Sequence, residues 1–279
     1  MVYNSKSLCF NILRKHSRIA AELLKEGIVV FDKGMELVMN AKTEPTGVLR
    51  LKLIEEMRTG RFADCDRLPR ETILSEQYGI SRTHLRDILA QLEREGFITR
   101  RHGVGTVINR HVVQVKNRMD IETEFLDMIR NNGHDPAVSQ VSIYEECADP
   151  VVAAKLQVPV GTEVIRLCRV CTADDRPALY CEDVVEKSRL LKPYQGTELD
   201  KPIFWFLQEF CHIDAYMDLT NLQAVLADEK LAKILEIPVG TPLLHMDEVD
   251  YDIEGNVVFY SSQYFVNDLF EHTVLRKKL

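Results

Sequence analysis

Apolar and polar positions change their period along residues 48–108, and the changes mark out one compact unit. Helical spacing predicts a first helix from Val48 to Arg58 and two more, separated at Gly79. Glycine adopts the left-handed conformation that often ends a helix, so we expect helix ends at Gly79 and near Gly96. The predicted core positions are Leu49, Leu53, Ile54, Met57, Ile73, Leu74, Tyr78, Leu85, Ile88, Leu89 and Leu92.

After Gly96 the pattern becomes strand-like. A short run from Phe97 to Arg100, a glycine-rich turn over residues 102–105 and a second run from Thr106 to Ile108 predict a β-hairpin. Two helices joined by a tight glycine turn and followed by a two-stranded hairpin form a winged helix-turn-helix.

The third helix carries the chemistry of this unit. Ser81 is a good N-cap, and Arg82 and Arg86 lie four residues apart on one face, with Thr83 beside them. An arginine fork can bind a phosphate or the O6 and N7 acceptors of guanine. Helix N-terminal amides also favour a phosphate. The pattern therefore predicts a DNA-binding helix; the alternative is a solvated basic face.

These residues resemble the DNA-binding domain of the GntR family. The shared motifs are Leu68-Pro69-Arg70-Glu71, Ser81-Arg82-Thr83-His84-Leu85-Arg86, Glu95-Gly96 and Gly103-Val104-Gly105-Thr106. Arg70 replaces a small residue of the family, which removes a helix cap worth about 1 kcal/mol. Thr72 stands where several members carry a base-reading arginine. The resemblance implies that DNA is contacted by Arg70, Thr72, Ser81, Arg82, Thr83, Arg86, His102, Gly103 and Gly105.

Charge is unevenly distributed along the chain. The net charge is −8, yet residues 49–110 carry 12 Lys and Arg against 9 Asp and Glu. Residues 111–279 carry 16 against 29, a net charge of −13. The acidic second half is therefore excluded as the nucleic-acid surface, while the first half can supply it.

No apolar run is long enough for a membrane span or a secretory signal, so we expect a cytoplasmic protein. Seven cysteines without a framework spacing are expected to be reduced thiols. Cys168 and Cys171 fall in a predicted strand, where an offset of three places them on opposite faces. We therefore expect neither a metal site nor a cofactor.

The second half contains an internal repeat. Residues 148–162 recur as residues 227–241, with 8 of 15 positions identical. Each copy predicts a short helix, a Pro-Val-Gly-Thr turn and two strands, namely 164–172 and 178–185, then 243–251 and 257–265. Two such units imply an α+β domain, an antiparallel sheet with pseudo-twofold symmetry and its helices packed on one side. A further helix, capped by Asp120, is expected to run to Gly133.

Residues 120–275 resemble the UTRA effector domain of the HutC branch of the GntR family. The resemblance rests on the repeated Leu-x-x-Pro-Val-Gly-Thr turns, on Arg169 ahead of Asp174-Asp175-Arg176-Pro177, on Glu182, and on the segment from Val258 to Asp268. It implies a chorismate-lyase-like fold that binds a small metabolite between its two repeat units. Binding would alter the placement of the DNA-binding heads in a homodimer.

Arg169 and Glu182 are the effector-binding residues that this resemblance implies. A second family arginine is replaced by Cys171, so we expect a less cationic pocket in which Arg169 pairs with an anionic or strongly polar group. Equal spacing from the turn would let Arg169 and Glu182 face each other across the hairpin. Tyr260 and Tyr264 are weaker candidates. The alternative is that Arg169 and Glu182 form a salt bridge and contact no ligand.

We divide the chain into an extension of unknown role (1–46), a winged helix domain (47–110), a linker (111–119) and an effector and dimerisation domain (120–279). Residues 1–46 do not match the family and are interpreted as an added segment or a misplaced start. The predicted function is a homodimeric repressor, released from an inverted-repeat operator by a small metabolite. A lyase-type enzyme is the alternative, but no nucleophile elbow or phosphate loop is present. An architectural DNA-binding protein without effector is a third possibility.

Overall fold

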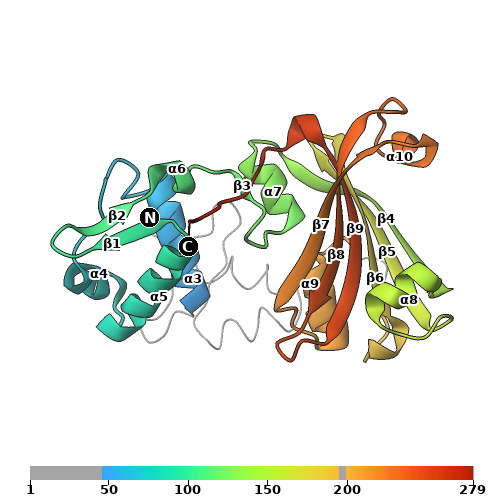
Figure 1. Cartoon of the computed structure of the whole chain (residues 1–279), viewed down its shortest axis with the longest axis horizontal. Coiled ribbons are helices and arrows are strands. Elements are labelled where there is room, and N and C mark those ends of the chain that lie inside the picture. The colour runs from blue at the N-terminus through green and yellow to red at the C-terminus, as the bar shows by residue number, and fades with distance from the viewer. Residues whose placement is uncertain (1–45, 195–198, 279) are drawn as a thin grey trace, which may run out of the picture. The chain divides into compact units, whose positions relative to one another are not determined.

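The chain divides into two compact units between Gln114 and Val115, and each is described separately. The computed structural model describes residues 46–194 and 199–278 (Figure 1). The predictions made for the N-terminal extension therefore fall outside the described residues, apart from its last position.

The first unit is a winged helix-turn-helix, as predicted. Its elements are α3 (Thr46–Arg58), α4 (Glu71–Tyr78), α5 (Arg82–Arg94), β1 (Ile98–Arg101), β2 (Gly105–Ile108) and α6 (Arg110–Val113). Gly79 caps α4 with φ of 63°, and its N–H reaches the carbonyl of Glu76. The predicted core is buried except at Tyr78, which is half-buried, and at Ile73, which is 44% exposed. Ile73 lies about 100° around the helix from the buried Leu74, so it points outward.

The second unit is built on a six-stranded antiparallel sheet. Its strands are β4 (Pro136–Cys147), β5 (Glu163–Ala173), β6 (Arg176–Glu186), β7 (Met217–Leu226), β8 (Pro242–Tyr251) and β9 (Val257–Val266). They are ordered β4-β5-β6-β9-β8-β7. The two repeat units are therefore adjacent, with β6 paired to β9 at the centre. This arrangement confirms the pseudo-twofold sheet.

The two repeat helices lie on one face of this sheet, as predicted, and further helices that the repeat did not predict cover the other face (Figure 1). The face that we call the α8 face is covered by the repeat helices α8 (Pro150–Leu156) and α10 (Glu229–Ile234). The opposite face, which we call the α7 face, is covered by α7 (Phe125–Asn131), α9 (Ile203–Phe206) and the π-helical turn η3 (Leu207–Cys211). Aromatic side chains of α9 and η3 pack there on Phe259.

The helix α7 begins later than predicted and has a different N-cap residue. Asp120 does not cap the helix, which begins five residues later with Glu124 at the N-cap. Asp120 instead accepts hydrogen bonds from Arg118 and from the N–H of Leu275. The expected linker contains α6 of the first unit and β3 (Asn117–Arg118), which pairs in parallel with β10 (His272–Thr273). The short turns η1 (Lys187–Arg189) and η4 (Asn267–Leu269) complete the second unit.

Candidate DNA-binding surface and effector cavity

The α5 helix presents the basic side chains that the sequence singled out. Ser81 Oγ accepts a hydrogen bond from the N–H of His84 at 3.1 Å, which confirms the predicted N-cap. Arg82, Thr83 and Arg86 are exposed, while the leucine face of the same helix is fully buried. The helix is therefore fixed by its core, and its polar face is open at the N-terminal end.

Residues of α4 adjoin this surface. Arg86 Nε donates to Glu71 Oε2 at 2.7 Å, so an ion pair connects the first turn of α4 to α5. Arg70 occupies the N-cap of α4 and makes no side-chain cap bond, as its side chain predicts. Thr72 is exposed in the first turn.

The tip of the wing is open. Gly103 and Gly105 have φ of 75° and 100°, and a Cβ added to either would meet no atom within 4 Å. His102 between the strands is exposed. Arg67, which the sequence analysis did not single out, donates to the carbonyl of Val104 at 3.1 Å and so holds the turn.

In the second unit, Arg169 and Glu182 do not face each other. The strands pair Thr172 with Pro177 but Cys171 with Leu179, so one extra residue bulges out of β6. Such a bulge moves every later side chain to the other face. Arg169 consequently pairs with Cys181, and Glu182 points to the opposite side of the sheet. The predicted juxtaposition was wrong, and so was the alternative of a salt bridge between these two residues.

Glu182 lies on the α8 face among charged partners. It accepts from Arg166 at 2.9 Å, from Lys230 at 2.9 Å and from the Tyr180 hydroxyl at 2.7 Å. These contacts lower the pKa of its carboxyl against the effect of burial, which is the largest single influence. Glu182 is therefore held as a carboxylate by protein groups.

Tyr260 and Tyr264 share this face with Glu182. Tyr264 stacks on His245 with ring centroids 4.5 Å apart, and Tyr260 is buried beside α8. Three of the four predicted effector residues thus lie on the α8 face, away from Arg169. Their role in effector binding stays a prediction.

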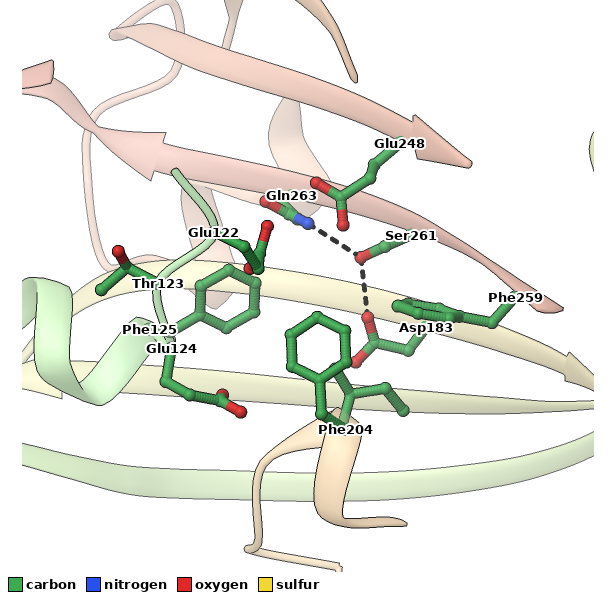
Figure 2. Close-up of a pocket in the computed structure, with 11 residues that line it drawn as sticks. Glu122, Thr123, Glu124, Phe125, Asp183, Phe204, Glu248, Phe259, Ser261 and Gln263 are labelled. Carbon is green, nitrogen blue, oxygen red and sulfur yellow. Dashed lines mark hydrogen bonds between the residues drawn. The ribbon is translucent and has the colours of Figure 1, made fainter. Parts of the chain in front are cut away.

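Arg169 is buried on the α7 face, where it begins a chain of polar contacts. It is 3% exposed and donates to Asp183 Oδ2 at 2.6 Å and to the carbonyl of Lys201 at 2.7 Å. Ser261 donates to Asp183 Oδ1 at 2.7 Å, and Gln263 donates to Ser261 Oγ at 3.1 Å (Figure 2). Arg169 therefore supports Asp183, which itself lines a small pocket.

A larger cavity of about 260 Å³ lies on the same face. Its polar lining includes Asn117, Glu122, Asp218 and Glu248. The apolar lining includes side chains from the segment around α7 and from the sheet, among them Ile121, Phe125, Met128, Leu222, Met246 and Phe265. Glu122 also borders the pocket beside Asp183 and a more open hollow next to α9. The α7 face thus offers a concave site with convergent polar groups, which is typical of small-molecule binding.

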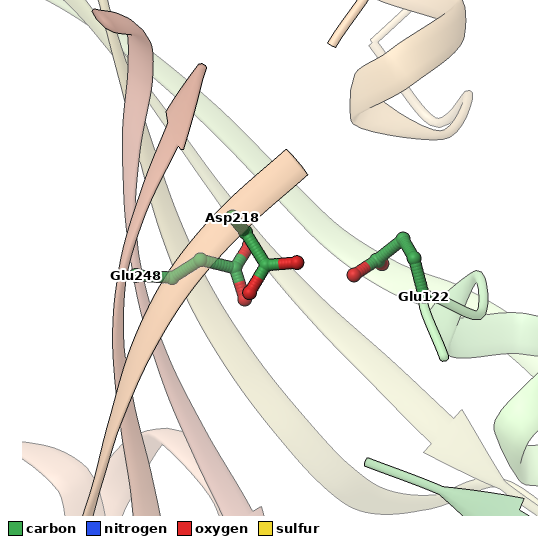
Figure 3. Close-up of side chains that lie close together, drawn as sticks. All are labelled: Glu122, Asp218 and Glu248. Atoms are coloured by element: carbon green, nitrogen blue, oxygen red, sulfur yellow. The ribbon is translucent and has the colours of Figure 1, made fainter. Parts of the chain in front are cut away.

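Three carboxylates meet at this cavity. Glu122, Asp218 and Glu248 each offer an oxygen, and the three oxygens lie within 4.8 Å of one another (Figure 3). Burial, together with Glu248 and Asp218, raises the pKa of Glu122 to about 8, although part of this residue stays open to solvent. Burial likewise raises the pKa of Glu248. This cluster was not predicted, because its three members lie far apart in the sequence and no local pattern connects them.

Each of the two units is similar to a known protein family. Residues 47–108 match the bacterial regulatory proteins of the gntR family, and residues 131–271 match the UTRA domain. The chain belongs to the GntR family of transcriptional regulators. Like its relatives, it is a ligand-responsive DNA-binding regulator and not an enzyme.

Two relatives illustrate the similarity of this GntR regulator to named repressors. The probable fructoselysine utilization operon transcriptional repressor of Escherichia coli K12 is 24% identical over 213 residues, which cover 76% of this chain and 86% of the relative. The mannosyl-D-glycerate transport/metabolism system repressor MngR of the same strain is 22% identical over 228 residues, which cover 81% of this chain and 93% of the relative.

Among solved structures, the possible transcriptional regulator YydK from Bacillus subtilis has the same fold. It superposes with a TM-score of 0.66 at 16% identity, covering 84% of this chain and all of that one. Within the described part of the GntR regulator, no helix combines the length and apolar character needed to cross a membrane.

Proposed function

We propose that the protein represses transcription as a homodimer and leaves its operator when a small molecule occupies the cavity on the α7 face. The observation that carries this proposal is the pairing, in one chain, of an exposed basic recognition helix with a concave polar site in a UTRA domain. Both relatives described above are named as repressors, which favours repression over activation.

The DNA contact is assigned to α5, the start of α4 and the wing. Arg82 and Arg86 would read bases, Thr83 and Ser81 would approach the phosphates, and the open glycines of the wing would let the backbone come close to a groove. Arg70, Thr72 and His102 would add contacts at the edges of this surface.

The DNA assignment is tested with an operator selected from random DNA. In a gel-shift assay, Arg82→Ala should weaken binding by about 1–3 kcal/mol, the value of a bidentate base contact. Arg130→Ala is a matched control, because Arg130 is an exposed arginine of the second unit. Equal binding by Arg82→Ala and the wild type would refute the assignment.

A homodimer is proposed because one winged domain reads few base pairs, and a dimer on an inverted repeat spans half-sites about one helical turn apart or less. The second unit is the expected contact, since basic first units would repel each other. Its edge strand β7 supports this view: the sheet ends there, and Met217, Leu219 and Leu226 are about half or more exposed. Light scattering at micromolar concentration should give the mass of a dimer.

A further inference from the structure

The cavity on the α7 face gathers more carboxyl groups than the neighbouring cations can pair with. Glu122 comes from the segment before α7, Asp218 from β7 and Glu248 from β8. The Thr220 hydroxyl lies 2.6 Å from Asp218 Oδ1 and 3.1 Å from Glu248 Oε2, and its single proton can satisfy only one of these two carboxylates at a time. The lining cation Arg118 is paired with Asp120. Like charges this close repel each other unless protons or a cation separate them.

A second observation points to a missing partner in the same cavity. Asn117 lines it and is only 2% exposed, yet neither its amide nitrogen nor its oxygen has a hydrogen-bond partner among the described residues. Burying an amide without hydrogen-bond partners is unfavourable, because the hydrogen bonds that it made to water are lost and not replaced. Asp250 is also 2% exposed, and its Oδ2 has no hydrogen-bond partner among the described residues. Asp250 pairs with Asp218 across β7 and β8. Groups of this kind are normally satisfied, so they favour a polar ligand.

The remaining lining determines what kind of cation fits. A bare metal ion needs little more room than its oxygen ligands, whereas this cavity measures about 260 Å³. Apolar side chains of Phe125, Leu222 and Met246 line it next to the carboxylates. Apolar surface gives no advantage to a hydrated ion but does stabilise the carbon skeleton of an organic molecule.

We propose that the effector is an organic cation, a protonated amine or guanidinium on a partly apolar body, whose charge binds between Glu122, Asp218 and Glu248. Its body packs against Phe125 and Met246, and Asn117 hydrogen-bonds a polar group at the other end. This assignment rests on the proposed function and names the class of its effector. It replaces the anionic effector expected from Arg169, because Arg169 is already paired with Asp183.

The ionisation of the site supports a cation. The charged groups around the carboxylate cluster are Arg118 on β3, Glu124 before α7, Asp183 on β6, Arg169 on β5 and Asp250 on β8. Each of the two arginines is paired with an aspartate, Arg118 with Asp120 and Arg169 with Asp183, and the other groups are acidic. Burial is the main reason that the pKa of Glu124 is raised to about 7. A bound cation would stabilise the ionised carboxylates and lower their pKa values, so binding would release protons.

The test uses thermal shift and calorimetry on the full chain with matched probes. Hexylamine and agmatine represent the organic cations, hexanol and hexanoate are their neutral and anionic counterparts, and Mg²⁺ and Mn²⁺ represent metal ions. The variants are Glu248→Gln and Asp218→Asn, each isosteric with the carboxylate that it replaces. Glu254→Gln is the control, because Glu254 is an exposed acid in the β8–β9 turn, outside the cavity.

We expect at least one amine to raise the melting temperature of the wild type while hexanol and hexanoate do not. Glu248→Gln and Asp218→Asn should each weaken the binding of that amine by on the order of tenfold or more, because each removes one charge-assisted contact. Glu254→Gln should bind as the wild type does. Asp218→Asn keeps the test valid if the buried Glu248→Gln variant does not fold.

Three results would overturn the proposal: a preference for hexanoate, stabilisation by metal ions alone, or amine effects no larger than those of hexanol. Each can be told apart from failure of the proposed function by a gel shift on the same preparations. Wild type and cavity variants that bind the selected operator equally would leave the regulator intact and remove only the cationic effector. A wild type that selects no DNA sequence would instead contradict the proposed function.

Discussion

Removing the Arg169 guanidinium should destabilise the second unit strongly. The side chains of Arg169 and Asp183 are 4% and 1% exposed, and their ion pair measures 2.6 Å. Breaking a buried pair by removing one partner costs about 3–5 kcal/mol, because the remaining charge stays buried without compensation. Asp183 keeps its bond from Ser261, which places Arg169→Met toward the lower end of that range. The double variant Arg169→Met, Asp183→Leu should recover much of the loss, because no buried charge remains.

This prediction can be measured by urea denaturation followed through tryptophan fluorescence. Trp205 is the single tryptophan of the chain and lies in α9, so its signal reports the second unit alone. Arg130→Met is the matched control. The side chains of Arg130 and Asp127 are 60% and 58% exposed, so their ion pair should contribute about 0–1 kcal/mol to the free energy of unfolding. If Arg169→Met lowered the free energy of unfolding no more than Arg130→Met, the account of Arg169 as a buried structural cation would be refuted.

Further predictions concern the first unit and the pH response. Ser81→Ala should lower the stability of the first unit by about 1 kcal/mol, measured by circular dichroism, because it removes the N-cap of α5. Leu89→Ala should cost about 2–5 kcal/mol in the same assay, since Leu89 is fully buried. Raised pKa values of Glu122 (about 8) and Glu124 (about 7) mean that the folded second unit holds protons that the unfolded chain has lost near neutral pH. Its stability should therefore fall from pH 6.5 to 8.5, and a Trp205 melting temperature that rose over this interval would contradict the assignment.

The first unit could be predicted from sequence because its signals are local. Ser81, Gly79 and the buried leucines of α5 each fix the backbone within a few residues, and the structure confirms them. The repeat in the second half likewise gave four of the six strands, because each copy pairs a buried strand with the same turn.

Two strands of the six-stranded sheet and the helix α9 were missed, for a physical reason. β4 and β7 form the edges of the sheet, and most of their residues are partly or fully exposed, so they lack a clear buried face. α9 has four residues, too few to show a helical period. The side assigned to Glu182 was wrong because a bulge in β6, opposite Cys171 and Thr172, adds one residue that strand alternation does not reveal.

The carboxylate cluster was beyond reach for a different reason. Glu122, Asp218 and Glu248 come from elements far apart in the chain. The sheet order brings β7 beside β8, and the packing of the segment before α7 on this face brings Glu122 to them. Taken singly, each is an ordinary acidic residue in an acidic domain. Their proximity, and with it the expected sign of the effector charge, follows from tertiary structure alone.

The most direct test of the account is a titration of the operator-bound protein with the amine that gives the largest thermal shift. Fluorescence anisotropy of labelled operator would follow the release of DNA. The account predicts that the amine releases the wild type near its dissociation constant and that Glu248→Gln requires on the order of tenfold more. Release of both proteins at the same concentration, or no release of the wild type at saturation, would contradict the claim that this cavity controls DNA binding.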